Sequence, residues 1–210
     1  MASFPQLPMR KITELCIHHS YTDRDQELDK SIQSFNDSHY LRLHVKHGQP
    51  VSGVAGSPHC AYHFVIAGNG DYKQTRKDEI IGYHASNIEA NKRSVAIVLT
   101  GNFDREKPTD AQLNSLREIV AQYKAKYPIE KITGHRNYAA KSCPGLHFPD
   151  ELINSLMQDE AEPFPEWAIP LVRHIKRNGV KTDLHTKVGD LHLYHLLAVI
   201  AKADVESYSW

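Results

Sequence analysis

Residue types that can hold a metal ion or attack a carbonyl carbon occur close together in the segment ITGHRNYAAKSCPGLHF. His135 and Cys143 stand eight positions apart, Lys141 lies between them, and the chain then reaches the turn-forming pair Pro144-Gly145. A turn lets side chains at such a separation converge on one point. The segment is therefore a candidate metal site, a candidate thiol nucleophile, or a polar loop without chemistry.

Residue type and spacing alone leave these three interpretations open. A catalytic zinc site needs three protein ligands and an open fourth position, and His18 is a third ligand that could join His135 and Cys143. In the second interpretation His135 acts as a general base for a Cys143 nucleophile. However, Cys143 is followed by proline and glycine, not by an obvious helix that would lower its pKa. In the third, the loop is only polar.

The composition of the 210-residue chain is typical of a soluble globular protein, with 40% hydrophobic and 24% charged residues. Its 25 Lys and Arg balance 25 Asp and Glu, so charge gives no reason to expect nucleic acid or an anionic membrane as a partner. No apolar run approaches the roughly 20 residues that span a bilayer, so membrane insertion is not expected. Three cysteines are too few for a disulfide framework and fit a reducing cytoplasm.

The elements that must position the candidate residues can be predicted from hydrophobic periodicity. An apolar run over 11–20 predicts a buried strand that ends at His18 and His19. Apolar residues at spacings of three and four predict a helix within 25–44. Gly68-Asn69-Gly70 predicts a hairpin whose first strand carries Tyr62 and His63. The further expected elements are a central strand at 94–103, a helix at 109–127 with a Thr109 and Gln112 capping box, a strand at 131–135 and a helix at 148–158.

Several segments together resemble a known enzyme family. CIHHS, AYHFVI, GYHAS, SVAIVLTGNF, TDAQLNSLREIV and GHRNYAAKSCPG follow one another in the order found in the zinc-dependent N-acetylmuramoyl-L-alanine amidases of the amidase-2 family. That family includes phage lysozyme-type amidases and animal peptidoglycan recognition proteins. The resemblance extends over residues 10–156. It implies an α/β fold with a mixed central sheet flanked by helices, a Zn2+ cofactor, and hydrolysis of the amide bond between N-acetylmuramic acid and L-alanine in bacterial peptidoglycan.

The resemblance implies a set of zinc ligands. In the family, a strand that ends in His-x-Ser supplies one ligand, which matches His18, while His19 occupies the variable position. The second ligand matches His135 of GHR and the third matches Cys143 of SCPG. Cytoplasmic recycling amidases have aspartate at the third position, and recognition proteins that have lost catalysis commonly have serine. A cysteine at this position therefore favours an active, phage-like enzyme.

The resemblance also implies roles for three other residues. Tyr62 of YHF matches a tyrosine near the catalytic water, and Lys141 matches a lysine near the scissile carbonyl. His84 of GYHAS matches a histidine that lines the site and is a candidate for substrate contact. Without the resemblance, a core tyrosine and a solvated loop lysine would be the favoured explanations of the first two. The loop at 44–60 is longer than in minimal phage amidases, which leaves substrate preference open.

The expected domain organisation follows from a change in composition near residue 159. We expect a zinc amidase catalytic domain over 1–158, an acidic and proline-rich linker over 159–170, and a small helical unit over 171–210. Roughly forty residues form a marginal independent core, so this unit is expected to bind the wall or to form a homo-oligomer.

The start of the chain bears on where the protein acts. It lacks the basic start, apolar stretch and cleavage site of a signal peptide, so we expect a phage endolysin made in the cytoplasm that acts on the wall after membrane permeabilisation. Two alternatives remain open. One is a non-catalytic module that binds muropeptides, and the other is a cytoplasmic peptidoglycan-recycling amidase.

Overall fold

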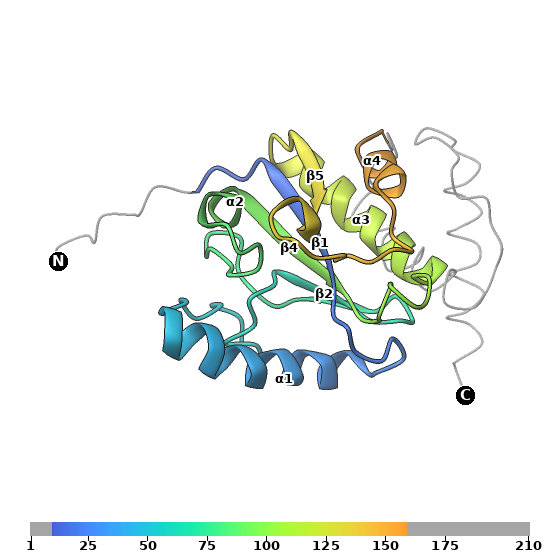
Figure 1. The fold of residues 1–210 in the computed structure, drawn as a ribbon. Coiled ribbons are helices and arrows are strands. Elements are labelled where there is room, and N and C mark those ends of the chain that lie inside the picture. The colour runs from blue at the N-terminus through green and yellow to red at the C-terminus, as the bar shows by residue number, and fades with distance from the viewer. Residues whose placement is uncertain (1–9, 159–210) are drawn as a thin grey trace, which may run out of the picture. The chain divides into compact units, whose positions relative to one another are not determined.

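The computed structural model describes residues 10–158, which form a mixed five-stranded sheet with helices on both faces (Figure 1). Across the sheet the strands are ordered β3-β2-β4-β1-β5. β2, β4, β1 and β5 are parallel neighbours, and β3 runs antiparallel beside β2. The strands are β1 (Glu14–His19), β2 (Phe64–Ile66), β3 (Tyr72–Gln74), β4 (Ser94–Leu99) and β5 (Lys131–Gly134). The predicted fold class is confirmed.

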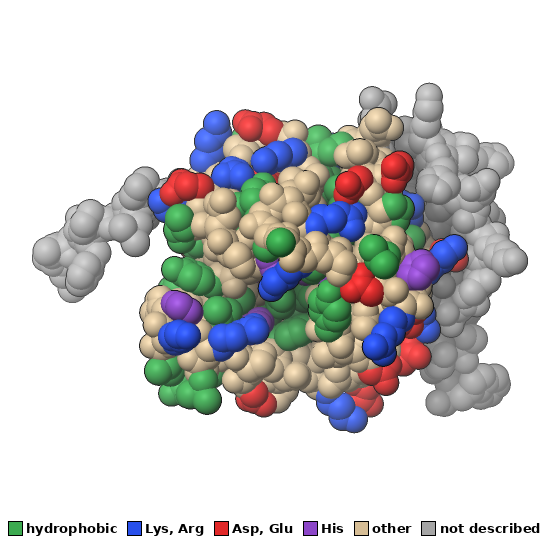
Figure 2. Space-filling model, viewed as in Figure 1, with side chains coloured by type: hydrophobic (Ala, Val, Ile, Leu, Met, Phe, Trp, Pro, Cys, Tyr) green, Lys and Arg blue, Asp and Glu red, His purple; other side chains and the backbone are tan. Residues whose placement is uncertain are grey.

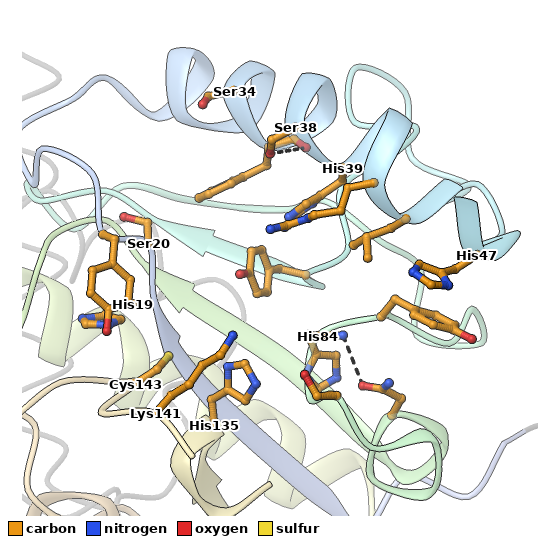
Figure 3. A pocket seen from close by; sticks show the side chains of 18 of the residues that line it. His19, Ser20, Ser34, Ser38, His39, His47, His84, His135, Lys141 and Cys143 are labelled. Atoms are coloured by element: carbon orange, nitrogen blue, oxygen red, sulfur yellow. Dashed lines mark hydrogen bonds between the residues drawn. The ribbon is translucent and has the colours of Figure 1, made fainter. Parts of the chain in front are cut away.

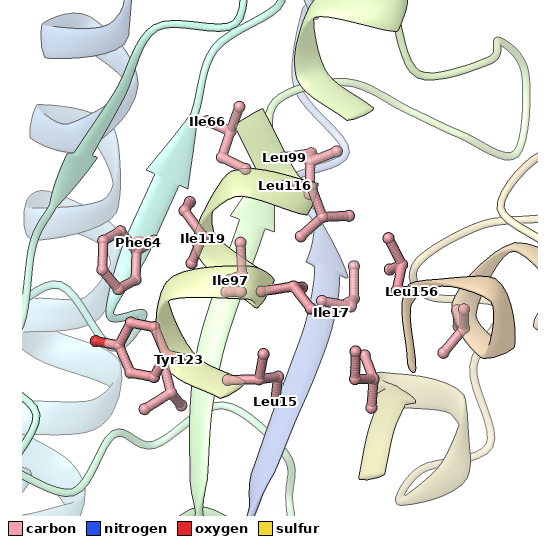
Figure 4. Close-up of a cluster of buried hydrophobic side chains, with 14 of the residues drawn as sticks. Leu15, Ile17, Phe64, Ile66, Ile97, Leu99, Leu116, Ile119, Tyr123 and Leu156 are labelled. Carbon is pink, nitrogen blue, oxygen red and sulfur yellow. The ribbon is translucent and has the colours of Figure 1, made fainter. Parts of the chain in front are cut away.

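Side chains along β1 point alternately to the two faces of the sheet, and this decides which of them belong to the main core. Leu15 and Ile17 belong to the larger hydrophobic cluster, which α3 (Asp110–Lys126) and α4 (Asp150–Gln158) cover (Figure 4). Successive side chains of a strand point to opposite faces, so Cys16 and His18 lie on the other face. β1 and β4 are buried along their whole length because both faces of the sheet are covered.

The opposite face of the sheet packs against α1 (Leu28–His39), which lies along the lower side of the sheet in Figure 1. Ile32 and Phe35 of this helix form a smaller cluster with Cys60, Val65 and Val98. This cluster is small and does not fill the whole face. The remaining part of the face, towards the end of β1, is where His18 lies.

The helix predicted from the capping box is confirmed. Thr109 accepts a hydrogen bond from the backbone N–H of Gln112 at 3.0 Å, and the Gln112 side chain accepts one from Thr109 N–H at 3.1 Å. The predicted strands at β1, β4 and β5, the hairpin of β2 and β3, and the closing helix α4 are also present. Local periodicity and capping chemistry were sufficient for these elements.

Three details differ from the prediction. The expected helix within 25–44 ends at His39, and Tyr40–Val45 form a π-helix, η1, which has no buried residue to hold α-helical register. Tyr62 and His63 precede β2 instead of lying on it. Ala96 N–H donates to Nδ1 of the His63 ring, at 3.0 Å, so a side chain replaces a backbone partner there. A short helix, α2 (Ile88–Arg93), was not predicted.

The expectations for the rest of the chain lie outside the described residues. These are the linker over 159–170 and the helical unit over 171–210. Within 10–158, no helix combines the length and the apolar character needed to cross a membrane.

Candidate metal centre and groove

The sheet register brings the two predicted histidine ligands together. β1 and β5 are parallel, with Ile17 opposite Gly134, so the next residues along the two chains are His18 and His135. Their ring centroids lie 4.8 Å apart, and both side chains are buried. Two histidines separated by more than a hundred positions in the sequence therefore meet because each follows the end of an apolar stretch of a neighbouring strand.

Cys143 completes a three-residue cluster with these histidines. Its Sγ lies 3.8 Å from Nδ1 of His18, and the ligand atoms of the three residues all lie within 4.8 Å of one another. Nε2 of His135 is buried and has no hydrogen-bond partner among the described residues. A buried polar atom without a partner is costly, and a bound cation would satisfy it. Two imidazoles and one thiol are a donor set that fits zinc, whose ligands lie about 2.0–2.3 Å from the ion.

Burial sets the charge of these groups. Desolvation lowers the pKa of His18 well below its usual value and lowers the pKa of His135 to about 4, with Lys141 adding to the latter shift. Both rings are therefore neutral at pH 7 and offer a lone pair. Burial also raises the pKa of the Cys143 thiol to about 12. That shift is opposite to what an activated thiol nucleophile requires, and a cation beside the sulfur would reverse it.

A second group of potential ligands overlaps with the first. Cys16, His18 and His84 also have ligand atoms within 4.8 Å of one another. Cys16 is fully buried and is absent from the groove lining, whereas His135 and Cys143 line the groove. A catalytic metal needs an open position that substrate can reach. The geometry therefore favours the cluster of His18, His135 and Cys143.

The loop that carries Cys143 is held by Arg136, the residue after His135. The Arg136 guanidinium donates to the carbonyls of Ser142 at 3.3 Å, Gly145 at 3.1 Å and Phe148 at 2.5 Å. Its Nε also donates to Asp150 at 2.9 Å. One side chain thereby closes the loop against the start of α4. Sequence reasoning missed Arg136, and the only signal was a polar residue directly after a ligand histidine.

The same loop is tied to the segment after β1. Tyr21 Oη and Ser142 Oγ lie 2.8 Å apart, and each donates to Oδ2 of Asp104, at 3.0 Å and 2.7 Å. Oδ1 of Asp104 accepts from the backbone N–H of Leu146 at 3.0 Å. Asp104 thus holds both sides of the Cys143 loop. Nothing in the spacing of these residues predicted the arrangement.

His135 and Cys143 of this cluster line a groove of about 910 Å³ between α1 with η1 and the loop around His84 (Figure 3). Figure 2 shows this face hollowed, with Lys or Arg side chains beside the hollow. Tyr62, Lys141 and His84, the other residues singled out from the sequence, all line it. Of the predicted site residues, His135, Cys143, Tyr62, Lys141 and His84 line the groove, and His18 lies buried behind them in contact with His84 and Cys143.

Tyr62 and Lys141 differ in their surroundings. The Tyr62 ring lies 5.2 Å from the His18 ring and packs edge-on against Phe35, and burial together with Cys143 raises the pKa of its phenol above the usual value. It therefore carries its proton at neutral pH. Lys141 is exposed at the rim, and its charge lowers the pKa of His135. The groove thus offers a buried neutral donor and an exposed lysine near the cluster of His18, His135 and Cys143.

His84 is bonded through both ring nitrogens. Nδ1 lies 3.0 Å from Nε2 of His18, and Nε2 lies 3.2 Å from Oγ of Ser94. Burial lowers the pKa of His84 to about 3, so the ring is neutral at pH 7. The predicted contact of His84 with substrate stays a prediction.

Comparison with known proteins gives the family of this chain. The family of N-acetylmuramoyl-L-alanine amidases called Amidase_2 matches residues 8–146. The chain belongs to this family. Among curated relatives, the endolysin of Enterobacteria phage T3 is 32% identical over 90 residues, covering 40% of this chain and 58% of that protein. Peptidoglycan-recognition protein LB of Drosophila melanogaster is 30% identical over 136 residues, covering 61% and 53%.

Several solved structures are similar to this chain in fold. The amidase LysC from Clostridium intestinale is 26% identical, with a TM-score of 0.56 over 70% of this chain and 86% of that one. Drosophila PGRP-LB is 27% identical, with a TM-score of 0.54 over 71% and 82%. The chain spans only 58% of the length of the phage T3 endolysin that it matches.

Proposed function

We propose that this Amidase_2 chain is a zinc-dependent N-acetylmuramoyl-L-alanine amidase that hydrolyses the bond between N-acetylmuramic acid and L-alanine in bacterial peptidoglycan. The observation that carries the proposal is the meeting of His18, His135 and Cys143 beside a groove that His135, Cys143, Tyr62 and Lys141 line. Bound by these three residues, zinc would supply a Lewis acid for the amide carbonyl and a water of lowered pKa. The protein residues supply binding, orientation and proton handling.

Lys141 is the residue we assign to the developing oxyanion. Its side chain lies at the exposed rim of the groove and is not one of the three proposed metal ligands. A preorganised cation near a tetrahedral oxyanion contributes about 3–4 kcal/mol to the stability of the transition state.

Tyr62 is assigned to proton handling. Because its phenol stays protonated, it can donate a hydrogen bond to a substrate oxygen or orient the attacking water. Its packing against Phe35 and His39 limits movement of the ring. The hydroxyl is therefore held in place before substrate binds.

The charge of the groove supports an anionic substrate. The described lining residues include Arg42 and Lys141 but no aspartate or glutamate. Such a surface attracts ligands with free carboxylates and has no negative side chain to repel them. The peptide stem of peptidoglycan carries free carboxylates. Two of the neighbouring structures are recognition proteins in complex with tracheal cytotoxin, a monomeric peptidoglycan.

We further infer that the protein acts as a phage endolysin, made in the cytoplasm and reaching the wall after the membrane is permeabilised. The support is the similarity to endolysins of phages T3 and T7, both 32% identical over 90 residues. Finding the protein in a culture supernatant before any lysis would contradict this inference.

The proposed ligand set is tested by two cysteine variants. Cys143→Ser should lose stoichiometric zinc, whereas Cys16→Ser, its matched control from the overlapping group, should retain one zinc per chain. Zinc content is measured on purified, folded protein, and hydrolysis is followed with a defined muramoyl-peptide by mass spectrometry of the products. Zinc retained by Cys143→Ser and lost by Cys16→Ser would assign the metal to the other group. Tight binding of the muramoyl-peptide without cleavage by the zinc-loaded wild type would identify a recognition module.

A further inference from the structure

We propose that His84 is a positioning residue that keeps the proton of His18 on Nε2 and so leaves Nδ1 of His18 free, facing Cys143, to bind the metal. This inference rests on the proposed zinc ligands and deepens that function. It assigns His84 a role through His18, distinct from the predicted contact with substrate. Three consecutive hydrogen bonds, from Ser94 through His84 to His18, fix the positions of these protons.

The first step begins at Ser94, whose hydroxyl has one proton to give. Ser94 Oγ lies 2.6 Å from the carbonyl oxygen of Ala90, which can only accept, so the hydroxyl donates there. The same Oγ lies 3.2 Å from Nε2 of His84. Because its own proton is committed, Ser94 accepts in this second bond. Nε2 of His84 must therefore carry a proton.

The second step passes from His84 to His18. A neutral histidine carries one ring proton, so with Nε2 protonated, Nδ1 of His84 is an acceptor. Nδ1 lies 3.0 Å from Nε2 of His18, and one proton must lie between the two nitrogens. His18 is therefore the donor. Nδ1 of His18 then bears the lone pair, and this is the atom that lies 3.8 Å from Cys143 Sγ.

The third observation concerns what holds His84 itself. Oδ1 of Asn91 accepts from the backbone N–H groups of His84 at 3.2 Å and Ala85 at 3.0 Å. The His84 ring stands at 90° to the His18 ring, with centroids 5.0 Å apart. Backbone and ring are thus both fixed, and His84 is almost fully buried. This rigidity is what a residue that orients a metal ligand requires.

The functional consequence is greater metal affinity. A ligand histidine whose other nitrogen is held by a partner keeps one tautomer and one ring orientation, and loss of such a partner typically costs 10–100-fold in affinity. In His84→Phe the Nε2–H of His18 would be left buried without a partner, and the other tautomer, which hides the lone pair from Cys143, would become populated.

The test compares zinc affinity, measured by competition with a chromogenic chelator, across four variants. We expect a 10–100-fold loss for His84→Phe, partial rescue in His84→Asn, whose side-chain oxygen can replace Nδ1 as the acceptor, and a loss within about tenfold for Ser94→Ala. Tyr83→Phe, a neighbouring groove residue, is the matched control and should bind zinc as the wild type does. Thermal unfolding of the metal-free proteins separates lost affinity from lost folding. If His84→Phe does not fold, His84→Asn and Ser94→Ala still decide the matter.

A second readout reports the tautomer directly. Long-range 1H–15N NMR of the metal-free wild type should find the His18 proton on Nε2, and a mixture of both tautomers in Ser94→Ala or His84→Phe. A proton on Nδ1 of His18 in the wild type would overturn the inference. Unchanged zinc affinity in a folded His84→Phe with a raised KM would overturn it in favour of substrate contact. Absence of zinc binding by the wild type would instead reject the proposed function.

Discussion

Among single residues, Lys141 is the one whose substitution can best distinguish an effect on catalysis from an effect on metal binding. It lines the groove and lies close enough to His135 to lower its pKa, yet it is not among the clustered ligands. Among residues 10–158, no side-chain hydrogen bond or ion pair explains an exposed lysine at this position. Its role is therefore best tested by removing the charge while keeping the aliphatic stem.

We predict that Lys141→Met lowers kcat for amide hydrolysis by about 10²–10³-fold, because it removes the cation that we propose to stabilise the oxyanion. Zinc content and thermal stability should stay at wild-type values, since the side chain is exposed. Steady-state kinetics on a defined muramoyl-peptide with parallel zinc analysis measures both. Loss of zinc together with activity would show that Lys141 acts through the metal cluster.

At the scale of elements, the loop from His135 to Gly145 must return Cys143 to the end of β1. Gly145 has a φ of +116°, a region that disfavours residues with a Cβ, and a Cβ there would lie 2.5 Å from the backbone of Phe103. Close approach of the two backbones is therefore possible only with glycine. The loop conformation, and with it the position of the cysteine, depends on this residue.

We predict that Gly145→Ala destabilises the protein by about 2 kcal/mol or more and weakens zinc binding, because strain and the clash both displace the loop. Gly56→Ala is the control, since Gly56 also has a positive φ, of +78°, but open space around it. It should cost about 1–2 kcal/mol and leave zinc affinity unchanged. Urea unfolding and chelator competition measure the two effects. Equal losses in both variants would contradict the role of the close approach.

The hydrogen bonds from Arg136 to the loop carbonyls give a second prediction for this loop. Arg136→Met removes donors to three backbone carbonyls, so the loop should loosen and zinc affinity should fall by about 10-fold or more. The Arg136 guanidinium holds the loop and does not line the groove, so KM for the substrate should change less than the affinity for zinc. Zinc titration and kinetics at saturating zinc distinguish the two. Wild-type zinc affinity in this variant would show that Asp104 alone holds the loop.

At the scale of the whole molecule, residues from distant parts of the sequence meet because parallel strands end at one edge of the sheet. The sequence predicted this for His18 and His135, since each follows an apolar strand. The turn-forming pair Pro144-Gly145 predicted that Cys143 could lie close to these two histidines. The hydrogen bonds of Arg136, Asp104 and Ser94 could not be predicted. They depend on tertiary contacts, which produce no periodic pattern of residues in the local sequence. α2 was missed because a six-residue helix has no apolar stripe.

Buried neutral histidines should also make the whole fold sensitive to acid. Burial, aided by Arg42 and Arg76, lowers the pKa of His39 to about 3, and its Nδ1 accepts from Ala61 N–H at 3.1 Å. A folded-state pKa below the unfolded value means that the stability is complete above about pH 6.5 and is lost as pH falls from there towards 3. The slope for one such group is about 1.4 kcal/mol per pH unit.

We predict that the free energy of unfolding of the wild type falls more steeply between pH 6.5 and 4 than that of His39→Gln, whose side chain does not titrate in this range. The difference between the two isolates His39 from the other buried histidines. Urea unfolding at a series of pH values measures it. Parallel curves for the two proteins would contradict the prediction.

The most direct test of the central claim is the release of new N-terminal alanine from purified sacculi, comparing the wild type with Cys143→Ser after zinc analysis and a check of folding. Our account predicts steady release by the zinc-loaded wild type and none above background by the variant, which lacks a ligand for the ion. Release by folded, zinc-free Cys143→Ser at the wild-type rate, or no release by the zinc-loaded wild type, would contradict it.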